Sequence, residues 1–188
     1  GDVDRMIGEA ERQFGGLDIV CNVAGINDLA YPLDETSDER WDNVLDLDLK
    51  APFRIARRAI GGMIERGGGV ILNIGSYAAL RGNHGPSYTA AKAGLTGLTR
   101  SIAVGFAAKG IRCNVLNPGA VDTDIKAHSG GDYHPRGLEL FRDIAGKLPV
   151  NWKCAPVEIA RAALFLCSDD ARHINGAEIA VDGGMSAC

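Results

Sequence analysis

Apolar and polar positions follow two different periods along this 188-residue chain, and the two periods predict helices and strands in turn. Residues 3–14 carry apolar side chains at helical spacing and are followed by Gly15 and Gly16, where a helix stops readily. Residues 17–23 are apolar at nearly every position, which is the pattern of a strand buried on both faces of a sheet. The first part of the chain therefore predicts a short amphipathic helix followed by a buried strand.

The same alternation continues along the rest of the chain. Ser37 or Asp38 can cap a helix that begins near Glu39. Pro52 is tolerated in the first turn of a second helix. Further helices are expected over residues 49–66, 87–109 and 156–167, and further strands over residues 70–74, 111–116 and 177–181. Because strands alternate with helices, we expect an α/β fold with a parallel sheet that is covered by helices on both faces.

One region departs from this pattern. Residues 126–150 mix glycine, histidine, proline and charged side chains, which indicates a loop with a short helix near residues 138–146. We expect residues 125–153 to form a lid over a substrate site. The chain has no repeat or low-complexity tract, so residues 1–188 are expected to form a single domain.

Composition narrows the possible partners and locations. Lys and Arg number 20 against 24 Asp and Glu, which is not the basic balance of a protein that neutralises nucleic-acid phosphates. No apolar run approaches the roughly 20 residues that span a bilayer, and the first residues do not form a signal segment. We therefore expect a cytoplasmic protein with no nucleic-acid or membrane partner. The five cysteines never approach C-x-x-C spacing, so neither a metal site nor a disulfide is expected.

The clearest chemical signal is the pair Tyr88 and Lys92. The two residues lie four positions apart on a predicted helix, so their side chains share one face. A cation beside a phenol favours the phenolate and lowers its pKa from the ordinary value of about 10. Such a pair is structural in most proteins, but this one follows a buried strand and a loop that contains Ser76. Open α/β sheets bind ligands at the carboxyl ends of their strands, so the position favours proton transfer.

These residues resemble the short-chain dehydrogenase/reductase family, and the resemblance extends over essentially all 188 residues. Tyr88 and Lys92 resemble the family's Y-x-x-x-K pair, and residues 73–76 resemble the strand segment that carries its catalytic serine. Further resemblances lie in the N-V-A-G turn at residues 22–25, in N-P-G at residues 117–119 with Val121 and Thr123, and in D-G-G at residues 182–184. The resemblance implies a Rossmann-like doubly wound sheet and an oxidoreductase that uses NAD or NADP.

The resemblance also implies a role for individual residues. Tyr88 would exchange a proton with the oxygen of a secondary alcohol or ketone, Ser76 would hold that oxygen, and Lys92 would bind the nicotinamide ribose and lower the pKa of Tyr88. The implied cofactor-binding residues are Asn22, Ala24 and Gly25 near the adenine-side ribose, Tyr88 and Lys92, and Pro118, Gly119, Val121 and Thr123 around the nicotinamide. The family's long helices form a four-helix interface, so a homodimer or homotetramer is expected.

Two departures from the family concern the site itself. Asp48 stands where the family's V-N-L-K segment carries its fourth catalytic residue, an asparagine. An ionised carboxylate only accepts hydrogen bonds, and one that pairs with Lys92 would compete with Tyr88 for the ammonium. In addition, Ser76 precedes Tyr88 by twelve residues, one fewer than in many members of the family. The histidines, His84 among them, lie in predicted loops or at a helix end and are expected to be solvated.

A third departure concerns the amino end. The family's T-G-x-x-x-G-x-G turn, which receives the pyrophosphate, is not in this sequence, and the resemblance begins at the family's third helix. The family's preceding portion, about 60 residues, holds the residue that selects NAD or NADP. The alternative hypothesis is a cofactor-less remnant that acts as a binding or oligomerisation module. Its strand at residues 17–23 would present an apolar edge that promotes aggregation.

Overall fold

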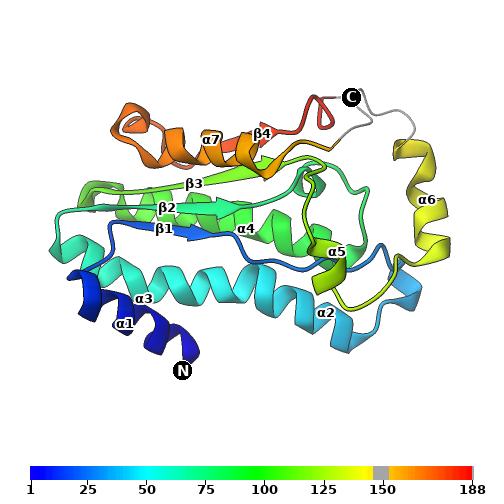
Figure 1. Ribbon diagram of the computed structural model, residues 1–188, viewed down its shortest axis with the longest axis horizontal. Helices are drawn as coiled ribbons and strands as arrows, with labels where there is room; N and C mark the ends of the chain where they lie inside the picture. The colour runs from blue at the N-terminus through cyan, green and yellow to red at the C-terminus, as the bar shows by residue number, and fades with distance from the viewer. Residues whose placement is uncertain (146–152, 188) are drawn as a thin grey trace.

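The computed structural model describes residues 1–145 and 153–187, and its centre is one parallel sheet (Figure 1). The four strands lie in the order β1, β2, β3, β4, and each neighbouring pair is parallel. Their bounds are β1 Ile19–Asn22, β2 Gly69–Ile74, β3 Ile111–Pro118 and β4 Glu178–Val181. These strands coincide with the four apolar runs in the sequence, so the predicted parallel α/β sheet is confirmed.

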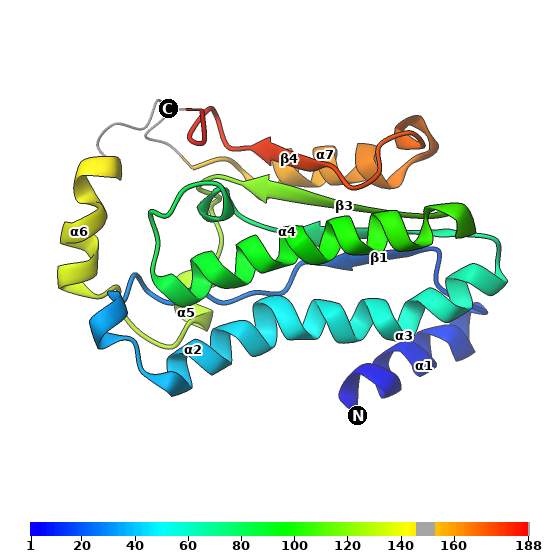
Figure 2. The same cartoon turned by 180° about the vertical axis from the view of Figure 1, so that it is seen from behind.

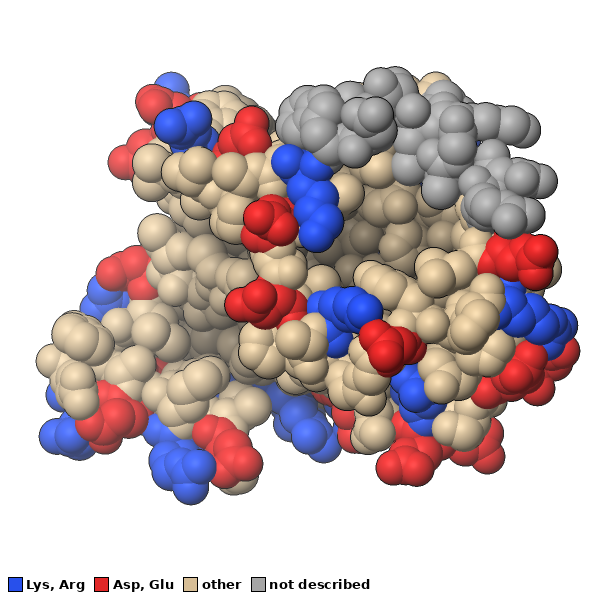
Figure 3. Space-filling model, turned by 45° about the vertical axis from the view of Figure 1, so that its right-hand side comes forward, with Lys and Arg blue, Asp and Glu red and all other residues tan. Residues whose placement is uncertain are grey.

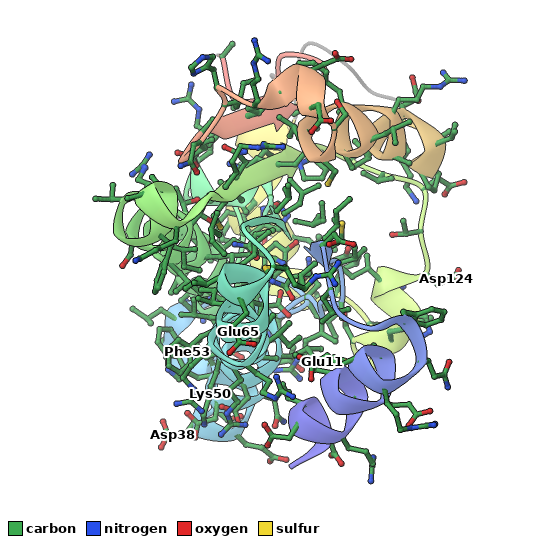
Figure 4. All side chains as sticks on the ribbon, turned by 90° about the vertical axis from the view of Figure 1, so that its left-hand side faces the viewer. Glu11, Asp38, Lys50, Phe53, Glu65 and Asp124 are labelled. Carbon is green, nitrogen blue, oxygen red and sulfur yellow. The ribbon has the colours of Figure 1, made fainter. Side chains whose placement is uncertain are left out.

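Helices cover both faces of the sheet, as Figures 1 and 2 show from opposite sides. The helices are α1 Asp2–Phe14, α2 Asp38–Leu45, α3 Ala51–Glu65, α4 Pro86–Phe106, α5 Ile125–His128, α6 Pro135–Ala145 and α7 Pro156–Cys167. Helices α3 and α4 lie on one face, with α1 beside α3, and α7 lies on the other face. Glu11 of α1 accepts hydrogen bonds from Arg58 of α3 at 2.6 and 3.0 Å, which ties the two helices together (Figure 4).

Successive residues of β2 enter two different cores. Ile71 packs in the core between the sheet and helices α1, α3 and α4, together with Met63 and Ile111. Leu72 packs on the opposite face with Leu166 of α7. A strand that buries both faces needs apolar residues at successive positions, which explains why its sequence shows no alternation.

Helices α2 and α3 are continuous, which differs from the two separate helices that the sequence predicts. Ser37 caps α2 by accepting a hydrogen bond from the backbone N–H of Arg40 at 3.2 Å, as expected. Residues Asp46–Lys50 then form a π-helical turn, and α3 begins at Ala51 with Pro52 in its first turn. A π turn holds one more residue than an α turn, and such turns are frequent at functional sites. Asp48, at the centre of this turn, is fully buried.

The segment predicted to be a lid is partly helical. It contains α5 and α6, and its residues 146–152 lie outside the described part of the chain. The described part contacts the loop after β1: the backbone N–H of Asn27 donates to Ser129 Oγ, and that of His134 donates to the carbonyl of Leu29, both at 2.8 Å. Among the residues that the structure describes, no helix is long and apolar enough to cross a membrane.

Candidate active site

The residues singled out in the sequence gather at the carboxyl ends of β1, β2 and β3. Ser76 follows β2, Gly25 follows β1, and Tyr88 lies in the first turn of α4. All three strands are parallel, so these ends meet on one side of the molecule. Figure 3 shows that the molecule is hollowed on this side.

Ser76 is held in place by a chain of hydrogen bonds across the sheet. Its backbone N–H donates to Asn117 Oδ1 at 3.0 Å, and the amide nitrogen of Asn117 donates to Glu178 Oε1 at 2.9 Å. Gly75 makes this approach possible, because a Cβ at that position would overlap Asn117 Oδ1. The Ser76 hydroxyl oxygen accepts from the backbone N–H of Ala78 at 3.1 Å. Side chains of β3 and β4 therefore hold the backbone of Ser76 in place.

Tyr88 and Lys92 lie together and are almost completely buried, with exposed fractions of 6% and 4%. Lys92 Nζ is 5.5 Å from the centre of the Tyr88 ring. The ammonium donates to the carbonyl of Ile74 at 3.1 Å and lies 3.2 Å from Asp48 Oδ2. The Ser76 side chain is close enough to the Tyr88 phenol to lower its pKa. The structure thus brings the four residues predicted as catalytic into one cluster.

Asp48 forms the other half of a buried ion pair. Its Oδ1 accepts the backbone N–H of Ile26 at 2.9 Å, and its Oδ2 faces Lys92. Burial raises the pKa of the Asp48 carboxyl, and the charge of Lys92 opposes that rise. Gly25 lies directly against the pair, since a Cβ there would be 3.2 Å from Asp48 Oδ2 and 3.3 Å from Lys92 Nζ. The family-like turn after β1 and the Asp48–Lys92 pair therefore form one unit.

The electrostatics of Tyr88 differ from the sequence-based expectation. Burial raises the pKa of the Tyr88 phenol above its usual value, the Ser76 side chain opposes that rise, and the charges of Asp48 and Asp28 add to it. The expected lowering of this pKa is therefore wrong for the structure described. The main physical reason is that the phenol lies out of water; in addition, Asp48 faces the ammonium at 3.2 Å and offsets its charge.

The residues predicted to contact a nucleotide lie around this cluster. The Asn22 side chain turns inward and donates to Asn73 Oδ1 at 2.7 Å, whereas Ala24 is exposed. Pro118 ends β3, and Gly119 packs against the D-G-G segment, because a Cβ at Gly119 would lie 2.9 Å from the Cα of Asp182. Further along the same loop, Val121 forms an isolated bridge with Cys154, and the Thr123 side chain is exposed.

Two residues of the site were not predicted. His84 is not a solvated surface histidine: its ring lies 5.6 Å from that of Tyr88 and 5.2 Å from that of Tyr77, and burial lowers its pKa. Asp28, in the loop after β1, is fully buried against the start of α4. In the sequence Asp28 follows an asparagine in a loop, which is an ordinary turn signal, so no local pattern indicates a long-range contact. Across the described residues, no group of three or more His, Cys, Asp or Glu could hold a metal ion.

Comparisons with known proteins agree with this geometry. The family model described as enoyl-(acyl carrier protein) reductase matches residues 1–186. A 3beta-hydroxysteroid dehydrogenase 2 of Eggerthella lenta is 38% identical over 99% of this chain and 71% of its own length. A solved putative short-chain dehydrogenase/reductase of Burkholderia xenovorans is 34% identical with a TM-score of 0.83, covering 99% of this chain and 71% of that one. A gluconate 5-dehydrogenase of Burkholderia cenocepacia, solved with NADP and tartrate, is 30% identical with a TM-score of 0.85 and the same coverage.

Proposed function

The chain belongs to the short-chain dehydrogenase/reductase family, and from that premise we propose that Tyr88 exchanges a proton with the oxygen of a secondary alcohol or ketone. As a member of the family it is an oxidoreductase that acts on CH–OH donors with NAD or NADP. The nicotinamide, when bound, supplies or accepts the hydride. The protein's own residues have to orient the substrate and move the proton.

The observation that carries the proposal is the buried cluster of Ser76, Tyr88 and Lys92 at the carboxyl end of parallel strands. The Ser76 hydroxyl, fixed from β3 and β4, would hold the substrate oxygen beside the phenol. The Tyr88 phenol would then lie within hydrogen-bond reach of that oxygen, which is the geometric requirement for a general acid or base. The cluster excludes water, so each of these hydrogen bonds is stronger than it would be in solvent.

The raised pKa of Tyr88 favours the protonated phenol over the phenolate. A phenol with a raised pKa keeps its proton at neutral pH and can donate it to a carbonyl oxygen. Accepting a proton from an alcohol requires the phenolate, which Asp48 and Asp28 both disfavour. The arrangement therefore fits the reduction of a ketone at neutral pH and the oxidation of an alcohol at higher pH.

The residues around Lys92 fit a nicotinamide nucleotide. An ammonium has three donors, of which one donates to the carbonyl of Ile74, and Asp48 Oδ2 lies 3.2 Å away as an ion-pair partner that makes no hydrogen bond among the described residues. Lys92 therefore keeps an N–H for a ribose hydroxyl. Ala24 and Gly25 are small, and Ala24 is exposed, so a nucleotide could approach the backbone there. Pro118, Gly119, Val121 and Thr123 lie at the end of β3 and after it, and would surround the nicotinamide. In this proposal Asn22 acts indirectly, through Asn73, by holding the turn.

The first test is a titration of the chain with NADH and NADPH, followed by the fluorescence of the reduced nucleotide. We expect saturable binding by the parent chain. Binding should weaken by about tenfold or more in Lys92→Ala, because a charged hydrogen bond to the ribose is lost. Tyr88→Phe should bind with little change but lose turnover of secondary alcohols by about 10²-fold or more. Tyr31→Phe makes the same chemical change outside the cluster and serves as the control.

The alternative function gives a different result. A folded chain that binds neither nucleotide and turns over no alcohol would instead support a binding or oligomerisation module. If Tyr88→Phe binds nucleotide and turns over alcohol as fast as the parent chain, the proposed role of Tyr88 is contradicted.

A further inference from the structure

Asp28 is a buried carboxylate that contacts the helix carrying Tyr88. Its Oδ2 accepts the backbone N–H of Tyr88 at 3.0 Å and the hydroxyl of Ser87 at 3.2 Å. Gly85, the residue before α4, leaves room for this carboxylate, because a Cβ there would overlap Asp28 Oδ2. The side chain is 0% exposed, and it comes from a loop 60 residues earlier in the chain.

The position of this carboxylate has a clear physical effect. The first N–H groups of a helix have no partner within the helix, and the helix dipole makes that end partly positive. Tyr88 lies in the first turn of α4. Gly85, the residue just before this helix, has no side chain that could cap it. Asp28 supplies both the acceptor and the negative charge, and it does so at the backbone of the residue proposed to transfer the proton. A helix start held in this way fixes where the phenol lies.

The other carboxylate oxygen of Asp28 stabilises the turn formed by the next two residues, Leu29 and Ala30. Asp28 Oδ1 accepts the backbone N–H of Ala30 at 3.2 Å, and Asn27 Oδ1 accepts that of Leu29 at 2.6 Å. Leu29 and Ala30 both have left-handed backbone conformations, with φ of +58° and +57°. Side-chain-bearing residues rarely adopt this region, and outliers of this kind persist where the surroundings enforce them. Here the side chains of Asn27 and Asp28 hold the two residues in this conformation by accepting their backbone N–H groups.

The left-handed turn is the surface against which the segment with α5 and α6 rests. The backbone N–H of His134 donates to the carbonyl of Leu29 at 2.8 Å. Gly137 approaches so closely that a Cβ there would overlap the carbonyl oxygen of Ala30. One carboxylate therefore contacts the start of the Tyr88 helix and the turn that supports this segment.

We propose that Asp28 is a positioning residue of the active site, which fixes the first turn of α4 and thereby the place of Tyr88, and which links that turn to the docked segment around His134. This inference rests on the proposed function of Tyr88. It assigns to Asp28 no contact with substrate or cofactor. It predicts that Asp28 affects the rate of the chemical step more than the affinity for either ligand.

The test compares three variants. Asp28→Ala removes the side-chain contacts to Ala30, Ser87 and Tyr88, and Asp28→Asn keeps the size but removes the charge. Asn27→Ala loosens the same left-handed turn without touching α4. Folding is checked by circular dichroism and thermal melting. Hydrogen exchange is then measured for the Tyr88 amide and for the amides of residues 129–137, and kcat and KM are measured with a secondary alcohol.

We expect the Tyr88 amide of Asp28→Ala to exchange about tenfold faster or more, since it loses its hydrogen-bond acceptor. We expect kcat to fall about tenfold or more, because a small displacement of a reacting group is costly, while KM and nucleotide affinity change little. Asn27→Ala should speed exchange in residues 129–137 and leave the Tyr88 amide and kcat near the parent values. A folded Asp28→Ala with unchanged exchange or unchanged kcat would overturn the proposal, as would an Asn27→Ala that lowers kcat equally.

A separate measurement keeps this test independent of turnover. Carbon-13 labelling of the tyrosine ring allows the Tyr88 phenol to be titrated by NMR. The charged, titratable or hydrogen-bonding groups around it are Asp28, Asp48, Ser76, His84, Lys92 and Tyr133. Because the charge of Asp28 raises the pKa of Tyr88, Asp28→Asn should lower it. If the parent shows no turnover, the proposed function fails. Unchanged hydrogen exchange of the Tyr88 amide in a folded Asp28→Ala would then overturn the role of Asp28 as well.

Discussion

The ion pair between Asp48 and Lys92 determines how much positive charge reaches Tyr88. Asp48 lies 3.2 Å from the ammonium, whereas the phenol ring centre is 5.5 Å from it. A neutral side chain at position 48 would leave the ammonium free to stabilise the phenolate. We therefore expect Tyr88 to be a weaker acid in this protein than in a variant with asparagine at position 48.

We predict that Asp48→Asn shifts the pH dependence of alcohol oxidation toward lower pH. The charge of Asp48 raises the pKa of Tyr88, so its removal lowers that pKa, and the phenolate forms earlier as pH rises. The measurement is kcat against pH, carried from neutral pH to above the ordinary phenol pKa of about 10, because the pKa of Tyr88 is raised. Asp46→Asn is the matched control, since Asp46 lies in the same π turn but pairs with Lys50 at the exposed surface. A profile that does not move, or that moves equally in the control, would rule out this explanation.

At the scale of the element, contacts between the ends of neighbouring strands determine where the site residues lie. Regular periodicity identified β2 and β3, but the contact that fixes Ser76 runs from Asn117 of β3 to the backbone after β2. Gly75 permits that contact because it has no side chain. The sequence shows this glycine only as part of a turn. Its actual role depends on a neighbour 42 residues away, which no local pattern reports.

We predict that Gly75→Ala destabilises the protein by about 1–3 kcal/mol, because the added methyl overlaps the Asn117 amide and forces a shift of the strand end. Urea unfolding gives the free energy, and the rate of turnover reports on Ser76. Gly61→Ala is the control: this glycine lies in α3 with nothing near its Cβ position, so alanine there should stabilise by about 0.5–1 kcal/mol. Equal effects at the two positions would contradict the overlap.

At the scale of the whole molecule, apolar side chains remain exposed on two different faces. Val104 of α4 is 84% exposed and Phe53 of α3 is 42% exposed. On the other side of the sheet, Leu164 of α7 is 73% exposed and Ile19 of β1 is 47% exposed. Exposed apolar residues that share a face mark association surfaces in many proteins. The family resemblance favours the α3 and α4 face.

We predict that the chain associates through α3 and α4, and that Val104→Lys shifts it toward the monomer. A charged side chain at the centre of an apolar contact is costly because it loses water without gaining a partner. Light scattering after gel filtration measures the mass of the parent and of each variant. Leu164→Lys makes the same change on the opposite face. If Leu164→Lys, and not Val104→Lys, reduces the mass, the surface beside β1 and α7 is the interface instead.

Local patterns along the chain were enough to locate the strands and most of the helices and to single out Ser76, Tyr88 and Lys92, because hydrophobic periodicity and i to i+4 spacing are local properties. The resemblance to the family, and not a local pattern, marked Asp48 as unusual. Folding decided the rest. The π turn that buries Asp48, the inward turn of Asn22, the packing of His84 and the capping of α4 by Asp28 depend on contacts that the chain makes only when folded. The raised pKa of Tyr88 is of the same kind, since burial and charge at a site are set by neighbours that only folding brings together.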